Sequence, residues 1–200
     1  MTTLENNEGI RIEPSTKTIL FAWIGVGLFL AFLIVITSPT GVLLGESKWA
    51  LASTLHGMLS IFGAVVVSVA AYLGWKLYLG QLKAEGDLRV FSALSVLASA
   101  ATIIFGNWVY IGYREAGGPR SWFIENSPEV HEIFFEFKEF IALFTLPLAL
   151  GTMFTIWTYR ERLREDKSLR TTVALLLIVT WAIFILTFVL GAAITKLRSV

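Results

Sequence analysis

The chain has 200 residues, of which 56 % are hydrophobic, and its formal net charge at pH 7 is only +1. A near-neutral chain without a basic face argues against a nucleic-acid partner, and the absence of cysteine excludes disulfides, thiolate metal sites and cysteine nucleophiles. The mean hydropathy of +0.71 arises from long apolar runs between short charged segments. This pattern indicates membrane helices, because a soluble helix carries only one apolar stripe.

Five apolar runs follow a polar N-terminal tail over residues 1–17, which lacks the short basic start of a signal peptide. Each run reaches the roughly 20 residues that a membrane span needs at about 1.5 Å of rise per residue. We expect helices at 18–38, 49–80, 90–113, 128–159 and 171–195. The sequence therefore predicts an all-α integral membrane protein, a bundle of five transmembrane helices forming one domain over residues 18–196.

The fourth run differs from the others, because its first third is charged. Ser127 followed by Pro128 is typical of a helix N-terminus, so this helix is expected to begin before its apolar part. Pro147 is expected to kink it within the membrane. The segment from Tyr113 to Ser127 that precedes it is the one long loop on its side.

Lysine and arginine set the expected orientation. With the N-terminus inside, the outer segments carry five such residues: Lys48, Arg114, Arg120, Lys196 and Arg198. The inner segments carry ten: Arg11, Lys17, Lys76, Lys83, Arg89, Arg160, Arg162, Arg164, Lys167 and Arg170. The excess predicts the N-terminus inside and the C-terminus outside. The densest inner block, 159–167, is interpreted as a solvated loop.

The chain has two histidines, His56 and His131, and both are expected in the outer halves of their helices. Two imidazoles from two helices at one depth are what a bis-histidine haem needs. We therefore expect helices two and four to be neighbours, with the two residues within about 15 Å. The depths differ by about 13 Å if helix two ends at Lys76, and by about 3 Å if it ends at Lys83. Hydrogen bonding to a neighbouring helix is the alternative role for each histidine.

A second group of candidate residues lies on the fourth helix. Four glutamates share one face in an α-helix: Glu129, Glu132, Glu136 and Glu139. Lys138 and His131 lie in a second direction. These side chains form a candidate ion or proton site, centred on the last three glutamates and Lys138. The alternative is that the helix protrudes and its acids face water or pair with arginines.

The outer end of the third helix offers polar side chains at a similar depth, namely Asn107, Tyr110 and Tyr113. They are candidates for hydrogen bonds to haem propionates or to a quinone head group, with interfacial anchoring as the alternative. Arg114 and Arg120 are candidate propionate partners, because carboxylates favour arginine forks.

Five helices with histidines suited to axial ligation resemble the small haem-carrying membrane subunits of respiratory complexes and other b-type cytochromes. The resemblance covers the architecture of the whole chain but rests on two residues, His56 and His131. Most of those proteins carry four histidines for two haems, so at most one bis-histidine haem b fits here. The resemblance implies an electron carrier, with a quinone or a redox partner protein, within a larger membrane complex. It also implies the prokaryotic inner membrane or an equivalent energy-transducing membrane.

The residues support two functional hypotheses. The first is a cytochrome b-like electron-transfer subunit with one haem near the outer face, His56 and His131 being the metal ligands. The second is a cofactor-free ion- or proton-handling or assembly subunit centred on Glu132, Glu136, Glu139 and Lys138. No nucleotide-binding or metalloprotease motif favours a stand-alone enzyme. Helices one and five carry no acid or histidine and are expected to pack and face lipid.

Overall fold

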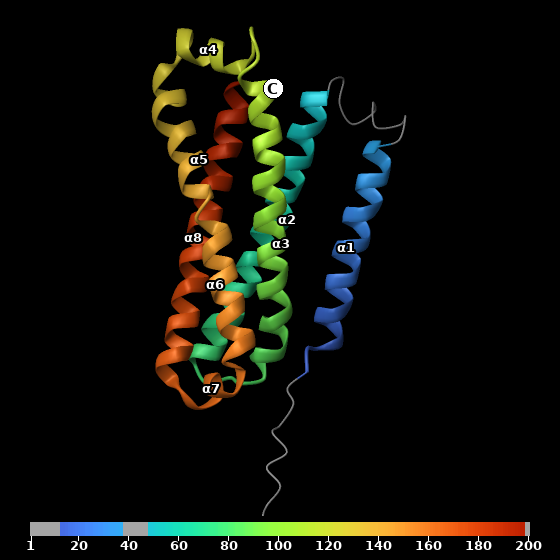
Figure 1. Cartoon of the computed structure of the whole chain (residues 1–200), viewed down its shortest axis with the longest axis vertical. Coiled ribbons are helices and arrows are strands. Elements are labelled where there is room, and N and C mark those ends of the chain that lie inside the picture. The colour runs from blue at the N-terminus through green and yellow to red at the C-terminus, as the bar shows by residue number, and fades with distance from the viewer. Residues whose placement is uncertain (1–12, 38–47, 199–200) are drawn as a thin grey trace, which may run out of the picture.

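The structure of the protein, a computed structural model, describes residues 13–37 and 48–198, and these parts hold helices and no strand (Figure 1). The first half contains α1 (Thr16–Thr37), α2 (Lys48–Tyr78) and α3 (Ala84–Tyr113). The second half contains α4 (Pro119–Asn126), the π-helix η2 (Val130–Phe135), α5 (Glu136–Ala142), α6 (Thr145–Thr158), α7 (Arg160–Glu165) and α8 (Lys167–Leu197).

Four helical stretches are long and apolar enough to cross a membrane: Trp49–Tyr78, Ala84–Tyr113, Val130–Thr158 and Lys167–Leu197. The third of these is built from η2, α5 and α6 in succession. The four stretches are consistent with a multi-pass integral membrane protein. The helix α1 is also apolar, but its searched part, Thr16–Ala31, is shorter than a span. Residue 38, the last of the first predicted span, lies outside the described residues. Membrane crossing by this first helix, and with it the total of five spans, stays a prediction.

The bundle is held together by α2, which packs on α3 and α8, and by α6, which packs on the same two helices. The largest core cluster lies in the half of the bundle near α7 and includes Val66, Leu77, Leu88, Ile156 and Leu177. The helix α1 lies apart from the other helices and packs mainly on α3 (Figure 1). The main apolar core therefore lies at the α7 end of the bundle, and the other end, which α4 covers, holds less of it.

The helices α8 and α3 show why boundaries drawn at apolar residues come too late. The helix α8 begins at Lys167 and not at residue 171, because the Asp166 side chain accepts hydrogen bonds from the backbone N–H groups of Ser168 and Leu169. The helix α3 begins at Ala84 and not at residue 90. Its first turn carries acids, which the helix dipole favours there.

The fourth predicted helix, 128–159, is present but interrupted. Helical hydrogen bonding breaks at Leu143 and Phe144. Proline has no N–H to bond the carbonyl four residues earlier, and Pro147 stands four residues after Leu143. The expected break therefore occurs at the carbonyl that Pro147 leaves without its donor. The π-helical turn at Val130–Phe135 is a second irregularity, of a kind often found at functional sites.

The basic segment near residue 160 is largely exposed, as the sequence predicted, but it is helical and not a loop. It forms α7, and two of its arginines bind one buried carboxylate, that of Glu85. The Nε atoms of Arg160 and Arg164 lie 2.7 and 3.0 Å from the two carboxylate oxygens of Glu85, whose side chain is only 1 % exposed. The start of α3 is thus clamped to α7. Glu85 was not among the predicted site residues, because hydropathy alone places it in a loop.

Candidate functional site

A cavity of about 670 Å³ lies between α2 and α3 on one side and α5 and α8 on the other. Its lining extends along α8 from Phe184 to Lys196, which corresponds to about 18 Å of helix at about 1.5 Å per residue, and includes Arg198 just beyond the helix. Lys196, Arg198 and Glu136 mark its end near α4, and all three are exposed. Because α8 ends at Leu197, the cavity runs from the α4 end of the bundle to near the middle of this helix.

His56 on α2 forms part of the inner wall of the cavity. Its Nδ1 lies 3.0 Å from the backbone oxygen of Thr102 on α3. A carbonyl only accepts hydrogen bonds, so Nδ1 carries the hydrogen and the neutral ring keeps its lone pair on Nε2. The ring also lies against Gly106, where an added Cβ would come within 3.0 Å of its Cε1 atom. A larger residue at this point would therefore crowd the imidazole, which packs closely on α3.

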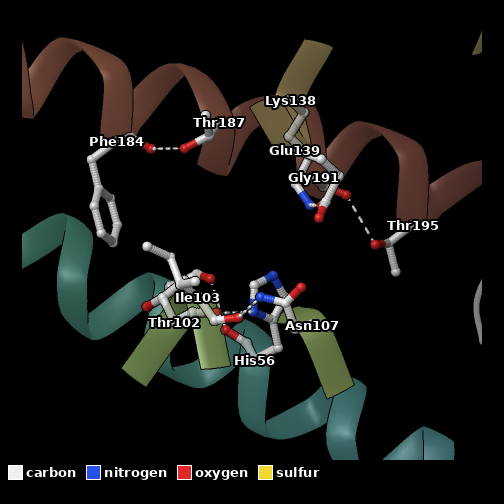
Figure 2. Close-up of polar contacts among 11 residues, drawn as sticks. His56, Thr102, Ile103, Asn107, Lys138, Glu139, Phe184, Thr187, Gly191 and Thr195 are labelled. Carbon is white, nitrogen blue, oxygen red and sulfur yellow. Dashed lines mark hydrogen bonds and ion pairs between the residues drawn. The ribbon is translucent and has the colours of Figure 1, made fainter. Parts of the chain in front are cut away.

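Lys138 and Glu139 on α5 face His56 across the cavity, as Figure 2 shows. The Lys138 ammonium lies 2.8 Å from a Glu139 carboxylate oxygen, and the two side chains are only 13 % and 29 % exposed. The lysine stem packs on Gly191 of α8, where a Cβ would lie 3.2 Å from its Cε. The ammonium also lies 5.4 Å from the centroid of the Phe135 ring. This ion pair is therefore enclosed by α8 and an aromatic ring at the level of the imidazole.

Two hydroxyl groups one turn apart on α3, the Oγ of Ser99 and the Oγ1 of Thr102, are buried and have no hydrogen-bond partner among the described residues. Thr102 is the residue whose backbone oxygen bonds His56. Thr102 also lines the cavity. Leaving a buried hydroxyl unpaired costs on the order of 1–3 kcal/mol. Unpaired buried groups beside a cavity are therefore a sign that something other than this chain supplies their partners.

The polar groups expected on α3 are present at the cavity but are partly engaged elsewhere. The side chain of Asn107 donates to the backbone oxygen of Ile103 in its own helix at 3.0 Å. Tyr110 stacks on Tyr113, and the Arg114 guanidinium lies 4.3 Å from the Tyr110 ring centroid. Both Asn107 and Tyr110 line the cavity, whereas Arg114 does not.

His131 belongs to a different cluster, under α4. It is 5 % exposed and is not part of the cavity lining. Arg120 donates through Nε to its Nε2 at 3.3 Å, so Nδ1 carries the hydrogen and donates to the Tyr113 hydroxyl at 2.9 Å. A Glu136 carboxylate oxygen lies 3.8 Å from the same Nε2. This network ties α4, η2 and the end of α3 together.

The histidine pair predicted from the sequence does not form one site in this arrangement. The Gly106 backbone beside His56 and the Tyr113 side chain that bonds His131 are seven residues apart on α3, about 10 Å along the axis. Both nitrogens of His131 have partners within the chain, so its role as an axial haem ligand, which stays a prediction, would require it to give up the contact with Arg120 or Tyr113. Its helix, η2, packs on α4, α5 and α8, whereas α2 packs chiefly on α3 and α8. Only His56 has a ring nitrogen suited to a ligand in the cavity.

The glutamate stripe is also divided. Glu136 and Glu139 line the cavity, whereas Glu129 and Glu132 are exposed and do not. Among the described residues, no group of three or more histidine, aspartate or glutamate side chains is placed to hold a metal ion. Of the residues predicted for an ion or proton site, the structure thus places Glu136, Lys138 and Glu139 at the same cavity as His56, and Glu132 outside it.

The wall contributed by α8 was not foreseen. This helix was expected only to pack and to face lipid, yet Thr187, Gly191 and Thr195 line the cavity. These small and hydroxyl-bearing residues recur every four residues, which places them on one helical face. That spacing was the available sequence signal. Lys196 and Arg198 are at the cavity mouth, whereas Arg120, the predicted propionate partner, is bound to His131.

No family model, no curated protein and no solved structure matches this chain.

Proposed function

We propose that this protein handles protons in the membrane, through a cavity in which His56, Lys138 and Glu139 are the proton-exchanging groups. The observation that carries the proposal is the Lys138–Glu139 ion pair, largely removed from solvent and facing an imidazole across a cavity. The proposed topology has five spans, including α1, with the α4 end outside, in keeping with the excess of basic residues at the α7 end.

The cost of burying charge supports a functional role for the pair. Removing two ions from water costs several kcal/mol each, and well-packed apolar side chains in their place are often as stable or more stable. Ionisable groups within membrane spans therefore mark ion or proton pathways. Glu136 extends the acidic side chains to the exposed mouth, so a proton arriving there meets a second carboxylate before the imidazole.

The imidazole and the ion pair have different roles in this proposal. The bond of Nδ1 to the Thr102 carbonyl holds the imidazole in the tautomer whose Nε2 accepts a proton. Lys138 neutralises Glu139 while the carboxylate is ionised, and it loses that partner when Glu139 takes a proton. Proton uptake at Glu139 thus releases the ammonium, which couples the charge of the site to the position of a flexible side chain.

The test is the titration of His56 in the ¹⁵N NMR spectrum of the full chain in lipid nanodiscs. The chain has only two histidines, so a His131→Gln variant assigns the remaining signal. We expect the His56 signal to follow the bulk pH, and Glu139→Gln to displace its titration because a facing charge is lost. Glu132→Gln removes an exposed carboxylate outside the cavity and should leave the curve unchanged. A His56 signal that ignores the pH, or that responds equally to both variants, contradicts the proposal.

A second candidate function is haem binding through His56 as one axial ligand. It is favoured by the Nδ1 bond to a backbone carbonyl, which is the usual outer partner of a metal-bound histidine. Lys196 and Arg198 at the mouth would pair with the propionates. A bound haem would supply one-electron transfer, and a quinone or a redox protein would be the partner within a larger complex of an energy-transducing membrane.

The spectrum of the reduced, purified protein tests this candidate. An α-band lost in His56→Ala and kept in His131→Ala would support a haem held by His56. Loss in both variants, with the fold intact, would support the bis-histidine haem inferred from the sequence. No α-band in protein purified from haem-replete cells would contradict both.

A further inference from the structure

The walls of the cavity also restrict what it binds. We propose that it takes a lipid-soluble 1,4-dihydroxy aromatic molecule, a quinol, in preference to the oxidised quinone. The inference rests on the proposed proton-handling role of the same residues and adds the class of ligand. It concerns binding alone, because oxidation of the quinol would need an electron acceptor.

The inner wall of the cavity presents a hydrogen-bond acceptor. With its hydrogen on Nδ1, neutral His56 offers an acceptor at Nε2 and no donor there. A hydroxyl group donates to such an atom, whereas a quinone carbonyl does not. The unpaired Oγ1 of Thr102 lies on the same wall and both donates and accepts. The inner wall therefore favours a ligand that ends in a hydroxyl.

The opposite wall combines a donor and an acceptor. The Lys138 ammonium has three hydrogens, of which one is directed at Glu139. A second hydroxyl at the far end of a ring accepts from Lys138 and donates to the Glu139 carboxylate. A molecule with a hydroxyl at each end therefore pairs with the acceptor of the inner wall and with both groups of the opposite wall. Its two protons then lie beside the two bases proposed above to exchange them.

The shape of the cavity suits a flat ring. The His56 ring packs on Gly106 and the Lys138 stem packs on Gly191, and both glycines line the cavity, so the two facing side chains lie close to their walls. Aromatic rings of Tyr110, Phe135 and Phe184 complete the lining. The volume of about 670 Å³ falls within the roughly 300–1,000 Å³ typical of small-molecule sites and exceeds one ring.

The lining of the cavity continues onto the outer surface of the bundle. Three cavity-lining side chains are also exposed on its apolar surface: Ile61 of α2 at 57 %, Phe140 of α5 at 64 %, and Leu143, which directly follows α5, at 54 %. Side chains that border both the cavity and this surface provide a lateral path for an apolar tail. A ligand with an apolar tail can extend along this path into the lipid, whereas a small water-soluble molecule has no apolar tail to place there.

The experiment compares the reduced and oxidised forms of a decyl-substituted 1,4-benzoquinone, measured by calorimetry with the full chain in detergent under anaerobic conditions. We expect the quinol to bind about tenfold more tightly than the quinone, the effect of one or two hydrogen bonds to buried groups. His56→Phe should remove this preference, whereas Glu132→Gln should keep it. The preference is a ratio within one protein, so it does not depend on how much of the protein is folded.

Equal affinity for the two forms, tighter binding of the quinone, or a preference that survives His56→Phe would overturn the inference. Equal binding of 1,4-benzoquinol without the alkyl tail would overturn the lateral path and with it the lipid-soluble class. The NMR titration separates the two proposals. A His56 that titrates in a protein with no quinol preference leaves proton handling in place and refutes the ligand. A quinol preference with a pH-insensitive His56 refutes proton handling.

Discussion

Glu85 is the buried carboxylate at the α7 end. Neutralising it should lower the free energy of unfolding more than neutralising any other acidic residue that the structure describes. Glu85→Gln removes the charge that faces both Arg160 and Arg164 at 2.7 and 3.0 Å. Breaking a buried ion pair by removing one partner costs roughly 3–5 kcal/mol. The two arginines are 27 % and 19 % exposed and regain some hydration, so we expect the low end, about 3 kcal/mol.

The assay is equilibrium unfolding in mixed detergent micelles, followed by circular dichroism, with the free energy taken from the linear dependence on denaturing detergent. Glu161→Gln on the same end is the matched control, because Glu161 is exposed, and it should change the free energy of unfolding by less than about 0.5 kcal/mol. A loss for Glu85→Gln no larger than the roughly 1 kcal/mol of a surface pair would refute the clamp between α3 and α7.

Three further substitutions test the packing and capping that position the site, each by the same unfolding assay. Gly63→Ala places a methyl group against the ring of Phe184 and should cost about 1–3 kcal/mol. Gly57→Ala on the same helix meets open space, and because alanine favours a helix over glycine it should be neutral or stabilising. An equal loss in both variants would show that overlap with Phe184 is not the cause. Asp166→Ala removes the acceptor for two N–H groups at the start of α8 and should cost about 1 kcal/mol, and no loss would mean that the cap is not formed. Tyr113→Phe leaves the buried histidine of η2 without a partner on Nδ1 and should cost about 1–3 kcal/mol, whereas a neutral result would show that the network under α4 is solvated.

The existence of the long helices could be predicted because lipid leaves the backbone few alternatives, and an apolar run of about 20 residues reports this directly. Their ends could not be placed from hydropathy alone. Polar first turns, such as the one holding Glu85 and the one capped by Asp166, belong to the helix and carry its stabilising contacts. Capping rules applied before the apolar count would have moved the α8 boundary to Asp166, whereas α3 follows Lys83, which makes no capping hydrogen bond.

The composition of the site could be predicted only in part, and the reason is the π-helical turn. The face shared by Glu132 and Glu139 was derived from 100° per residue, which holds only in a regular α-helix. A π-turn inserts one residue, so the residues after it are rotated by about 100° relative to the residues before it. The structure accordingly sends Glu132 outward and Glu139 into the cavity. The same turn keeps His131 under α4, away from His56.

Which helices surround His56 depends on tertiary packing that one sequence does not display. The imidazole was assigned to a partner on the fourth helix because the chain has two histidines. The structure instead gives it a backbone carbonyl on α3 and faces it with Lys138 and Glu139. A glycine on each wall, Gly106 and Gly191, makes both approaches possible.

Proton handling depends most on a cavity that is open to water at the α4 end, and cysteine labelling tests this opening directly. The chain has no cysteine, so one introduced thiol is the only target. Gly57→Cys lines the cavity and Gly151→Cys lies on the surface of α6, and a Cβ meets nothing within 4 Å at either position. Thiol reagents attack the thiolate, which forms in water and not in lipid. We predict that a membrane-impermeant maleimide, added on the outer side of sealed vesicles, labels Gly57→Cys and spares Gly151→Cys; equal labelling of both, or none at Gly57→Cys from that side, would contradict the outward-open cavity.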